Sequence, residues 1–179
     1  MFKKILVANR GEIAVRIIRA CKELNIKTVA IHSNVDTEAM HVKLADESIC
    51  VGSALPNESY LNIPSIISAI DITGADAVHP GYGFLSENDK FAKILSSHKV
   101  KFIGPTSKSI LELGNKSNAL KLASDFKLPI LGNKISKNLD NTSDAQKIAK
   151  EIGMPVVVKA AYGGGGKGMR VFRNSSEID

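Results

Sequence analysis

The sequence of 179 residues has no tryptophan, and aromatic residues make up only 5% of it. Proteins that bind single-stranded nucleic acid stack the bases on aromatic side chains, and this sequence offers no such platform. The formal net charge is +6, but the lysines are scattered along the chain rather than clustered. We therefore expect no nucleic-acid partner. We assign the local basic clusters to an anionic nucleotide and the other charges to solvation.

Long hydrophobic runs, cleavable leaders and cysteine-rich patterns are also missing. No apolar run reaches the length of a membrane span, and no small-residue cleavage site follows the short apolar run after Lys3 and Lys4. The two cysteines, Cys21 and Cys50, do not have metal-ligand spacing. Two cysteines in a chain of this size indicate a reducing compartment rather than a disulfide scaffold. We expect a cytoplasmic protein that does not bind a membrane.

Strand-like and helix-like segments alternate through the first part of the chain. The sequence is 44% hydrophobic with a mean hydropathy near zero, so that it can bury a core. Short apolar runs predict strands at residues 4–8, 27–32, 47–51, 75–79 and 101–103. Apolar residues at three- and four-residue spacing predict helices at residues 13–24, 36–45, 63–72 and 88–97. This alternation predicts an α/β fold with a doubly wound parallel sheet.

The remaining residues predict a second domain, with boundaries 1–113 and 114–179. Further helices are expected at residues 107–113, 116–126 and 144–152, with a polar loop before the last. The residues Asn-Ser-Ser-Glu at 174–177 resemble a helix capping box with Ser175 or Ser176 as the cap. A helix would begin there and the sequence then stops, so we expect a fragment of a longer protein.

A glycine-rich stretch near the end of the sequence predicts a phosphate-binding hairpin. An apolar run at 156–158 predicts a strand that ends at Lys159, and a second short strand is expected at 171–172. Four consecutive glycines and Lys167 lie between them. Glycines let backbone N–H groups turn toward an anion, and the lysines supply positive charge. The alternative is a flexible turn with solvated basic residues.

Neither of the commoner nucleotide motifs fits this stretch. A P-loop requires Ser or Thr after its lysine and then a helix, whereas Gly168 follows Lys167 and the next residues look extended. A dinucleotide-binding fingerprint opens a helix after the first strand, but the first such turn contains only Gly11. An NAD-binding domain is therefore the weakest of the readings considered. A phosphate loop between antiparallel strands favours the ATP-grasp arrangement.

Three single residues could carry chemistry. Lys116 lies at a predicted helix N-terminus, where a bound phosphate would offset the unfavourable helix dipole, and the alternative is an exposed lysine. Lys159 ends a strand predicted to be buried, where a charge is costly unless it is paired, and the alternative is a solvated lysine. His79 lies in a turn-rich segment at the carboxyl end of a strand, where parallel sheets bind ligands. We expect His79 to be a hydrogen-bonded structural residue rather than a base.

Four stretches of the sequence resemble the N-terminal part of biotin carboxylase. They are KILVANRGEIAVRIIRACKELNIKTVA, SYLNIPSIISAIDITGADAVHPGYGFLSEN, FIGPTSKSI and KAAYGGGGKGMRV. Their order and spacing cover nearly the whole chain. The sequence is most similar to the free-standing subunit of bacterial acetyl-CoA carboxylase. The corresponding parts of propionyl-CoA, methylcrotonyl-CoA and pyruvate carboxylases share most of these motifs.

The resemblance implies a reaction, cofactors and partners. Such enzymes use ATP with Mg²⁺ or Mn²⁺ to activate bicarbonate, and the resulting CO₂ carboxylates biotin on a biotin carboxyl carrier protein. In acetyl-CoA carboxylase this is the first half-reaction of an early step in fatty acid synthesis, and carboxyltransferase subunits complete it. A homodimer is also implied. The first domain would be the Rossmann-like N-terminal domain, and residues 114–179 the truncated beginning of an ATP-grasp domain.

The resemblance also implies roles for individual residues. The positions that match ATP-binding residues are Lys116, Lys159, Gly163, Gly164, Gly165 and Gly166. Tyr82 and Gly83 match positions on the biotin and bicarbonate side. Arg16, Arg19 and Glu23 match a helix at the homodimer surface of the family.

Two residues depart from the family pattern, and much of the active site would lie beyond the sequence. Asn115 stands where Asp is usual, which removes one charge near ATP, and Lys167 stands where Arg is common. The metal-binding glutamates, bicarbonate-binding residues, catalytic base and biotin-facing arginine of the family would all follow Asp179. We therefore expect no catalytic or metal-binding residue within this chain, and no activity from it alone. The rival of another class is a non-catalytic module for nucleotide binding or dimerisation.

Overall fold

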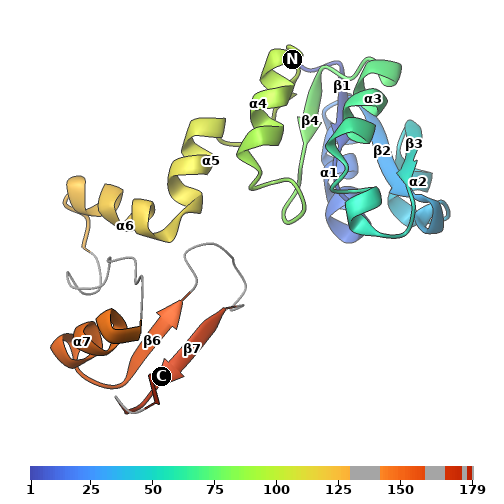
Figure 1. Ribbon diagram of the computed structural model, residues 1–179. Helices are drawn as coiled ribbons and strands as arrows, with labels where there is room; N and C mark the ends of the chain where they lie inside the picture. The colour runs from blue at the N-terminus through green and yellow to red at the C-terminus, as the bar shows by residue number, and fades with distance from the viewer. Residues whose placement is uncertain (130–141, 160–167, 175–176, 179) are drawn as a thin grey trace. The chain divides into compact units, whose positions relative to one another are not determined.

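The computed structural model describes residues 1–129, 142–159, 168–174 and 177–178 (Figure 1). They form two compact units, residues 1–111 and 112–179, and each is described by itself. The predicted glycine loop and the predicted cap at Ser175 or Ser176 lie outside the described residues.

The first unit contains a five-stranded parallel sheet with strand order β3-β2-β1-β4-β5. The strands are β1 (Lys4–Val7), β2 (Lys27–Ser33), β3 (Glu47–Gly52), β4 (Ala77–His79) and β5 (Lys101–Phe102). Strand β1 lies at the centre, where Ile5 is in register with Thr28 of β2 and with Ala77 of β4. The strand order reverses between β1 and β4, which confirms the predicted doubly wound α/β fold.

The helices of the first unit largely follow the predicted segments. They are α1 (Gly11–Glu23), α2 (Met40–Leu44), α3 (Ile63–Thr73) and α4 (Asp89–Ser97), with short 3₁₀ helices at Asn34–Asp36 and Pro56–Glu58. A further helix, α5 (Ser107–Gly114), begins in this unit and crosses its boundary at residue 111. Asn62 caps α3 by accepting a hydrogen bond from the Ser65 amide, and Asn88 caps α4 in the same way. The single helix predicted over residues 36–45 is wrong, because a 3₁₀ turn ends at Asp36 and α2 begins only at Met40.

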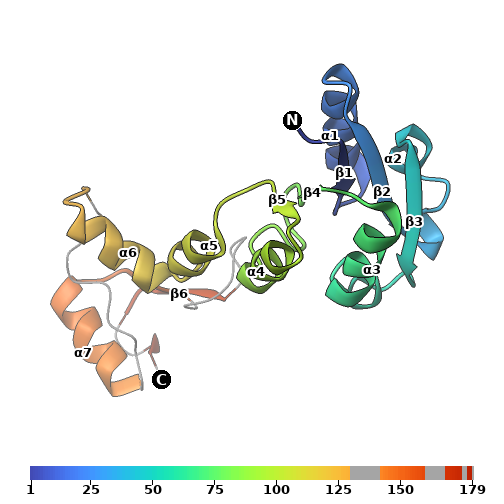
Figure 2. The ribbon, with the colours of Figure 1, turned by 90° about the horizontal axis from the view of Figure 1, so that it is seen from above.

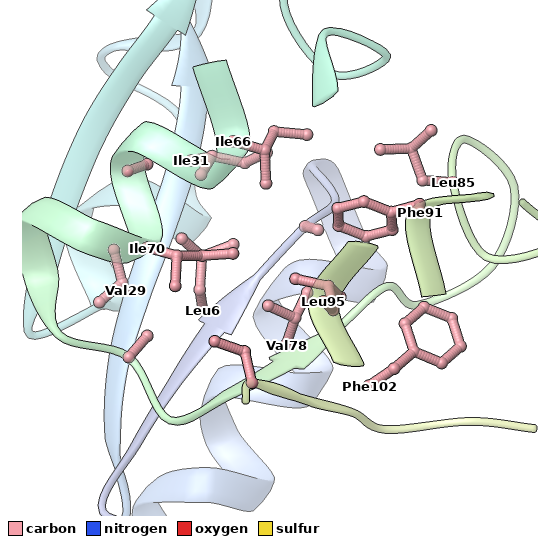
Figure 3. Packing of buried hydrophobic residues seen from close by; sticks show 14 of the residues in the cluster. Leu6, Val29, Ile31, Ile66, Ile70, Val78, Leu85, Phe91, Leu95 and Phe102 are labelled. Carbon is pink, nitrogen blue, oxygen red and sulfur yellow. The ribbon is translucent and has the colours of Figure 1, made fainter. Parts of the chain in front are cut away.

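Helices lie on both sides of the sheet (Figure 2). The side chains of the central strand alternate between these two layers. Ile5 and Val7 join the cluster that contains the apolar face of α1. Leu6 points the other way, into the larger cluster that α3 and α4 cover (Figure 3). In that cluster Phe91 and Phe102 meet edge to face, with ring centroids 6.2 Å apart. Burial on both sides explains why Ile5, Leu6 and Val7 are all apolar.

The second unit contains an antiparallel hairpin and two helices. Its elements are α6 (Lys116–Asp125), α7 (Thr142–Ile152), β6 (Val156–Lys159) and β7 (Met169–Phe172). Val156 is in register with Phe172, and Lys159 with Met169. The strand β7 begins two residues earlier than predicted. Helix α7 packs against one face of the hairpin through Ala149. None of the helices in the described ranges is long and apolar enough to cross a membrane.

Candidate functional site

The carboxyl ends of β1 and β4 meet at the point where the strand order reverses. In open α/β sheets ligands bind in the crevice at such a point. Here the side chain of Asn9 lies in that position, with 2% of its surface exposed. Its Nδ2 donates hydrogen bonds to the carbonyl oxygens of Pro80 (2.7 Å) and Tyr82 (2.8 Å). Its Oδ1 accepts one from the Arg10 amide at 2.9 Å. Asn9 thus joins the turn after β1 to the turn after β4.

The turn after β4 is also held from within. The ring Nδ1 of His79 accepts a hydrogen bond from the Gly81 amide at 3.0 Å, and burial lowers the pKa of His79. This contact agrees with the prediction that His79 is a hydrogen-bonded structural residue. Gly81 has φ of +65°, and a Cβ at this position would lie 2.8 Å from Nδ2 of Asn9. A side chain at position 81 would therefore push the two turns apart.

Tyr82 and Gly83, which the sequence assigned to the substrate side, lie on this same turn. Tyr82 is 57% exposed, and its hydroxyl donates a hydrogen bond to Oε1 of Glu12. The bond to this carboxylate raises the pKa of Tyr82. Glu12 is in the first turn of α1, so the exposed ring is tied to the sheet domain at its tip. The backbone of Tyr82 is fixed by Asn9 and its phenol by Glu12.

A second polar group lies at the carboxyl edge of β1 and β2. Arg10 donates two hydrogen bonds to the carboxylate of Asp36, through Nε at 2.8 Å and through the terminal nitrogen Nη2 at 2.6 Å. The Tyr60 hydroxyl donates to Oδ2 of Asp36 at 2.6 Å and accepts from the Ser33 amide at 3.0 Å. The guanidinium holds the pKa of Asp36 well below its usual range, and the carboxylate raises that of Arg10.

This polar group connects to the turn after β4 through aromatic contacts. The ring of buried Tyr60 stacks on Phe84, with centroids 5.2 Å apart. The guanidinium of Arg10 lies 5.8 Å from the centroid of the Tyr60 ring. Phe84 follows Tyr82 and Gly83 directly in the chain. The turn after β4 is therefore supported on one side by Asn9 and on the other by the group of Arg10, Asp36 and Tyr60.

Sequence reasoning missed Asn9, Arg10, Asp36 and Tyr60. Asn9 and Arg10 lie between the first predicted strand and the first predicted helix, and no motif marks them. The hydrogen bonds of Asn9 to the β4 turn span 71 and 73 residues, and Asp36 is 24 residues from Tyr60. No short motif reports such contacts. The available signal was position, since polar residues directly after buried strands of a parallel sheet lie at its ligand-binding edge.

An open groove of about 500 Å³ runs between α1 and α2. It is lined by Gly11, Glu12, Val15, Arg16, Arg19, Ala39, Met40 and His41. Two of the residues assigned to a dimer surface, Arg16 and Arg19, are thus on its wall, and Glu23 ends α1 beyond it. His41 is 1% exposed and its ring Nε2 faces the Ile31 carbonyl at 3.2 Å. Its Nδ1 has no hydrogen-bond partner among the described residues, and burial lowers its pKa.

The second unit carries the two lysines that the sequence assigned to ATP. Lys116 is the first residue of α6 and is exposed, and the preceding Asn115 caps the helix by accepting a hydrogen bond from the Asn118 amide at 3.1 Å. Lys159 ends β6 and is also exposed. The argument that Lys159 follows a buried strand is wrong, because β6 has only one covered face and Lys159 lies on the other. The four loop glycines, Gly163, Gly164, Gly165 and Gly166, lie outside the described residues.

The part of the chain that the structure describes contains His, Cys, Asp and Glu side chains. Within it, no group of three or more His, Cys, Asp or Glu side chains could hold a metal ion. What the described residues provide is a braced, exposed turn on the sheet domain and two exposed lysines on the second unit.

Comparison with known proteins gives two family matches in order along the chain. Residues 1–110 match the model of the biotin carboxylase N-terminal domain, and residues 115–179 match that of the ATP-binding domain of the carbamoyl-phosphate synthase L chain. A biotin carboxylase of Haemophilus influenzae is 50% identical over 179 residues, which is 100% of this chain and 40% of that protein. The mitochondrial propionyl-CoA carboxylase alpha chain of Rattus norvegicus is 52% identical over 170 residues, or 95% and 23% of the two chains.

Solved structures give the same picture. A complex of biotin carboxylase from Campylobacter jejuni with β,γ-ATP has a TM-score of 0.95 at 47% identity, covering 99% of this chain and 40% of that one. The biotin carboxylase domain dimer of 2-oxoglutarate carboxylase from Hydrogenobacter thermophilus, solved with MgADP, ADP and bicarbonate, has a TM-score of 0.94 at 47% identity. The match covers 99% of this chain and 39% of the Hydrogenobacter chain. The chain thus spans about 40% of the length of biotin carboxylases.

Proposed function

The chain belongs to the biotin carboxylase family, and we propose that the protein it is part of uses ATP and bicarbonate to carboxylate biotin on a carrier protein. The observation that carries this proposal is the ordered match of both domains along one chain. In the sheet domain, the buried side chain of Asn9 bridges the turns after β1 and β4 at the point where folds of this kind bind dinucleotides. The domain boundary that we propose lies between residues 113 and 114.

In this proposal the second domain binds ATP. Lys116 and Lys159 contribute positive charge toward the phosphates, and Gly163 to Gly166 form the loop over them. Both lysines are exposed at the end of an element, where a long side chain reaches a ligand without desolvation of its charge. Mg²⁺ or Mn²⁺ accompanies ATP and neutralises phosphate charge when bound, with ligands outside the described residues.

The sheet domain supplies the biotin and bicarbonate side in the same proposal. Tyr82 and Gly83 are on an exposed turn whose backbone is fixed, so that they can contact a substrate without a large ordering cost. Arg16, Arg19 and Glu23, on α1, contribute to a homodimer surface. Arg19→Glu would reverse a charge on this proposed dimer surface, four residues before Glu23. We expect this variant to shift the dimer toward monomer in analytical ultracentrifugation.

We further propose that the reaction is the first half-reaction of acetyl-CoA carboxylase, in the cytoplasm, with a biotin carboxyl carrier protein and carboxyltransferase subunits as partners. Cys21 and Cys50 are both free, and Cys50 is exposed, which suits a reducing compartment. The relatives include propionyl-CoA carboxylases at similar identity. Assay of the complete enzyme with each acyl-CoA separates these alternatives.

The experiment that tests the proposal measures bicarbonate-dependent ATP hydrolysis with free biotin. The full-length protein should turn over, and the 179-residue chain alone should not, because it spans only about 40% of the length of the biotin carboxylases that it matches. In the full-length protein, Lys116→Gln and Lys159→Gln should each raise the KM for ATP. The matched control is Lys43→Gln, at an exposed lysine that pairs with Glu38 on the sheet domain. Activity of the isolated chain, or equal KM values for all three variants, would contradict the assignment.

A further inference from the structure

We propose that Asn9 is a positioning residue that holds the Tyr82–Gly83 turn in place for biotin, and that its amide group is required for this. The inference rests on the proposed function, since it assumes that this turn faces biotin. Asn9 itself is buried beneath the turn, with 2% of its surface exposed, so it would not touch the substrate. Its effect would pass through the backbone of the turn.

The contacts of Asn9 use every polar atom of its side chain. Both hydrogens of Nδ2 are taken by carbonyl oxygens of the turn, that of Pro80 at 2.7 Å and that of Tyr82 at 2.8 Å. Oδ1 accepts from the Arg10 amide at 2.9 Å. Since two neighbours can only accept and the third can only donate, the orientation of the amide is fixed by its surroundings. Asn9 leaves no buried polar atom unsatisfied.

An aspartate of the same shape cannot make these contacts. When ionised it only accepts hydrogen bonds, so a carboxylate oxygen would face the carbonyl oxygens of Pro80 and Tyr82 with no proton between them. The turn would have to move away or admit water, because a buried carboxylate without donors is costly. Position 9 therefore requires the amide, although Asp and Asn have nearly the same volume.

The turn depends on Asn9 because its backbone at Gly81 packs closely against the Asn9 side chain. Gly81 lies between the two carbonyls that Asn9 binds, and an added Cβ there would meet Nδ2 of Asn9 at 2.8 Å. The hydrogen bond from the Gly81 amide to His79 fixes the start of the turn only. The bond from Asn9 to the Tyr82 carbonyl holds the backbone of the residue next to Gly83, whereas Glu12 holds only the hydroxyl at the end of its side chain.

The test compares Asn9→Asp with Asn62→Asp in the full-length protein, with free biotin as substrate. Asn62 is the matched control because it uses its side-chain oxygen to accept from the Ser65 amide, a contact that aspartate keeps. We expect kcat/KM for biotin to fall at least ten-fold in Asn9→Asp, through a higher KM for biotin, while the KM for ATP stays within two-fold. Asn62→Asp should match the wild type in both.

A second variant covers the case in which Asn9→Asp does not fold. In Asn9→Ser the hydroxyl can donate to one of the two carbonyls but not to both, so the loss in kcat/KM for biotin should be smaller, about three- to ten-fold. Hydrogen exchange of the Tyr82–Leu85 amides should be faster in either variant than in the wild type.

The outcomes separate the inference from the proposed function. If the wild-type protein carboxylates biotin and the KM for biotin of Asn9→Asp lies within two-fold of the wild-type value, the inference is overturned and the proposed function stands. A parallel fall of kcat with both KM values unchanged would also overturn it, since this indicates fewer folded molecules rather than a displaced turn. A wild-type protein that does not carboxylate biotin would overturn both.

Discussion

Replacement of Asp36 by alanine should destabilise the sheet domain far more than loss of an ordinary surface ion pair. The carboxylate accepts hydrogen bonds from Arg10, from the Tyr60 hydroxyl and from the Ser33 hydroxyl. In the Asp36→Ala variant the buried Tyr60 hydroxyl would keep the Ser33 amide as a donor but would lose its acceptor. The side chain of Asp36 is 12% exposed and that of Arg10 is 47% exposed. The hydrogen bond from Tyr60 and the ion pair with Arg10 therefore contribute different amounts to stability.

The expected cost follows from these exposures. A hydrogen bond from a buried hydroxyl to a charged group contributes about 1.5–3 kcal/mol. The half-exposed Arg10 pair is screened by solvent, and such pairs contribute about 0.2–1 kcal/mol. Asp36→Ala should therefore lower the free energy of unfolding of this unit by about 2–4 kcal/mol. Asp36→Asn keeps one acceptor oxygen and should cost about half as much.

Native-state hydrogen exchange is the appropriate assay, because the chain has two units and a single spectroscopic transition would mix them. The amides of Leu6 and Val29 lie in the central strands and report on the unit that contains Asp36. A double-mutant cycle of Asp36→Asn with Tyr60→Phe should give a coupling energy of about 1 kcal/mol or more. Glu38→Gln, in the exposed pair with Lys43, should change the stability by less than about 0.5 kcal/mol.

Two results would refute this reasoning. One is additivity of Asp36→Asn and Tyr60→Phe within about 0.3 kcal/mol, since residues that share a hydrogen bond should couple. The other is an Asp36→Ala variant no less stable than Glu38→Gln. Either would mean that water replaces the carboxylate at Tyr60 without loss.

Three further predictions concern stability. The free energy of unfolding should fall as the pH is lowered from 7 to 5, because burial lowers the pKa of His41 and His79 and the unfolded chain then binds more protons; replacing His41 by Gln should flatten this slope, which is at most about 1.4 kcal/mol per pH unit for each group. Phe91→Ala should cost about 3–5 kcal/mol by the same exchange measurement, since Phe91 is fully buried, and a value below about 1 kcal/mol would contradict the packing described. Gly52→Ala should prevent folding of the sheet, because the added Cβ would lie 1.8 Å from the Glu58 carbonyl oxygen, whereas Gly74→Ala, with open space around it, should cost only about 1 kcal/mol.

The sheet could be predicted from the sequence because its strands are buried on both faces. Residues such as Leu6 and Val29 belong to runs that are apolar at every position, as expected of strands that helices cover on both sides. The hairpin strand β6 has the same appearance in sequence, yet α7 covers only one of its faces. A run of three valines does not reveal how many faces are covered, so the burial of Lys159 was predicted wrongly.

The helix predicted over residues 36–45 failed for a different reason. Its periodicity is acceptable, but the carboxylate of Asp36 is engaged by Arg10 and Tyr60, which are distant in the sequence. That contact fixes Asp36 at the end of a 3₁₀ turn and delays α2 to Met40. Local pattern cannot anticipate a partner 24 or 26 residues away.

The candidate site likewise has a part that local sequence predicts and a part that depends on distant contacts. The position of Tyr82 at the ligand-binding edge could be predicted, because a turn after a parallel strand must lie there. The support beneath it could not, since Asn9 is an ordinary turn residue in sequence until β1 and β4 are known to be neighbours. The roles of Lys116 and Lys159 toward ATP stay predictions that nucleotide titration will test.

The central place of β1 in the sheet has a consequence for synthesis of the protein on the ribosome. Strand β1 emerges first and gains β2 as a neighbour early. Its other neighbour is β4, and the contact of Lys4 with Asp76 beside β4 can form only after 72 further residues are made. At a translation rate of about 5–20 residues per second, β1 waits for roughly 4–14 seconds with one edge unpaired. An unpaired apolar edge is open to other chains. Codons that slow translation before β4 should therefore increase aggregation of the nascent chain.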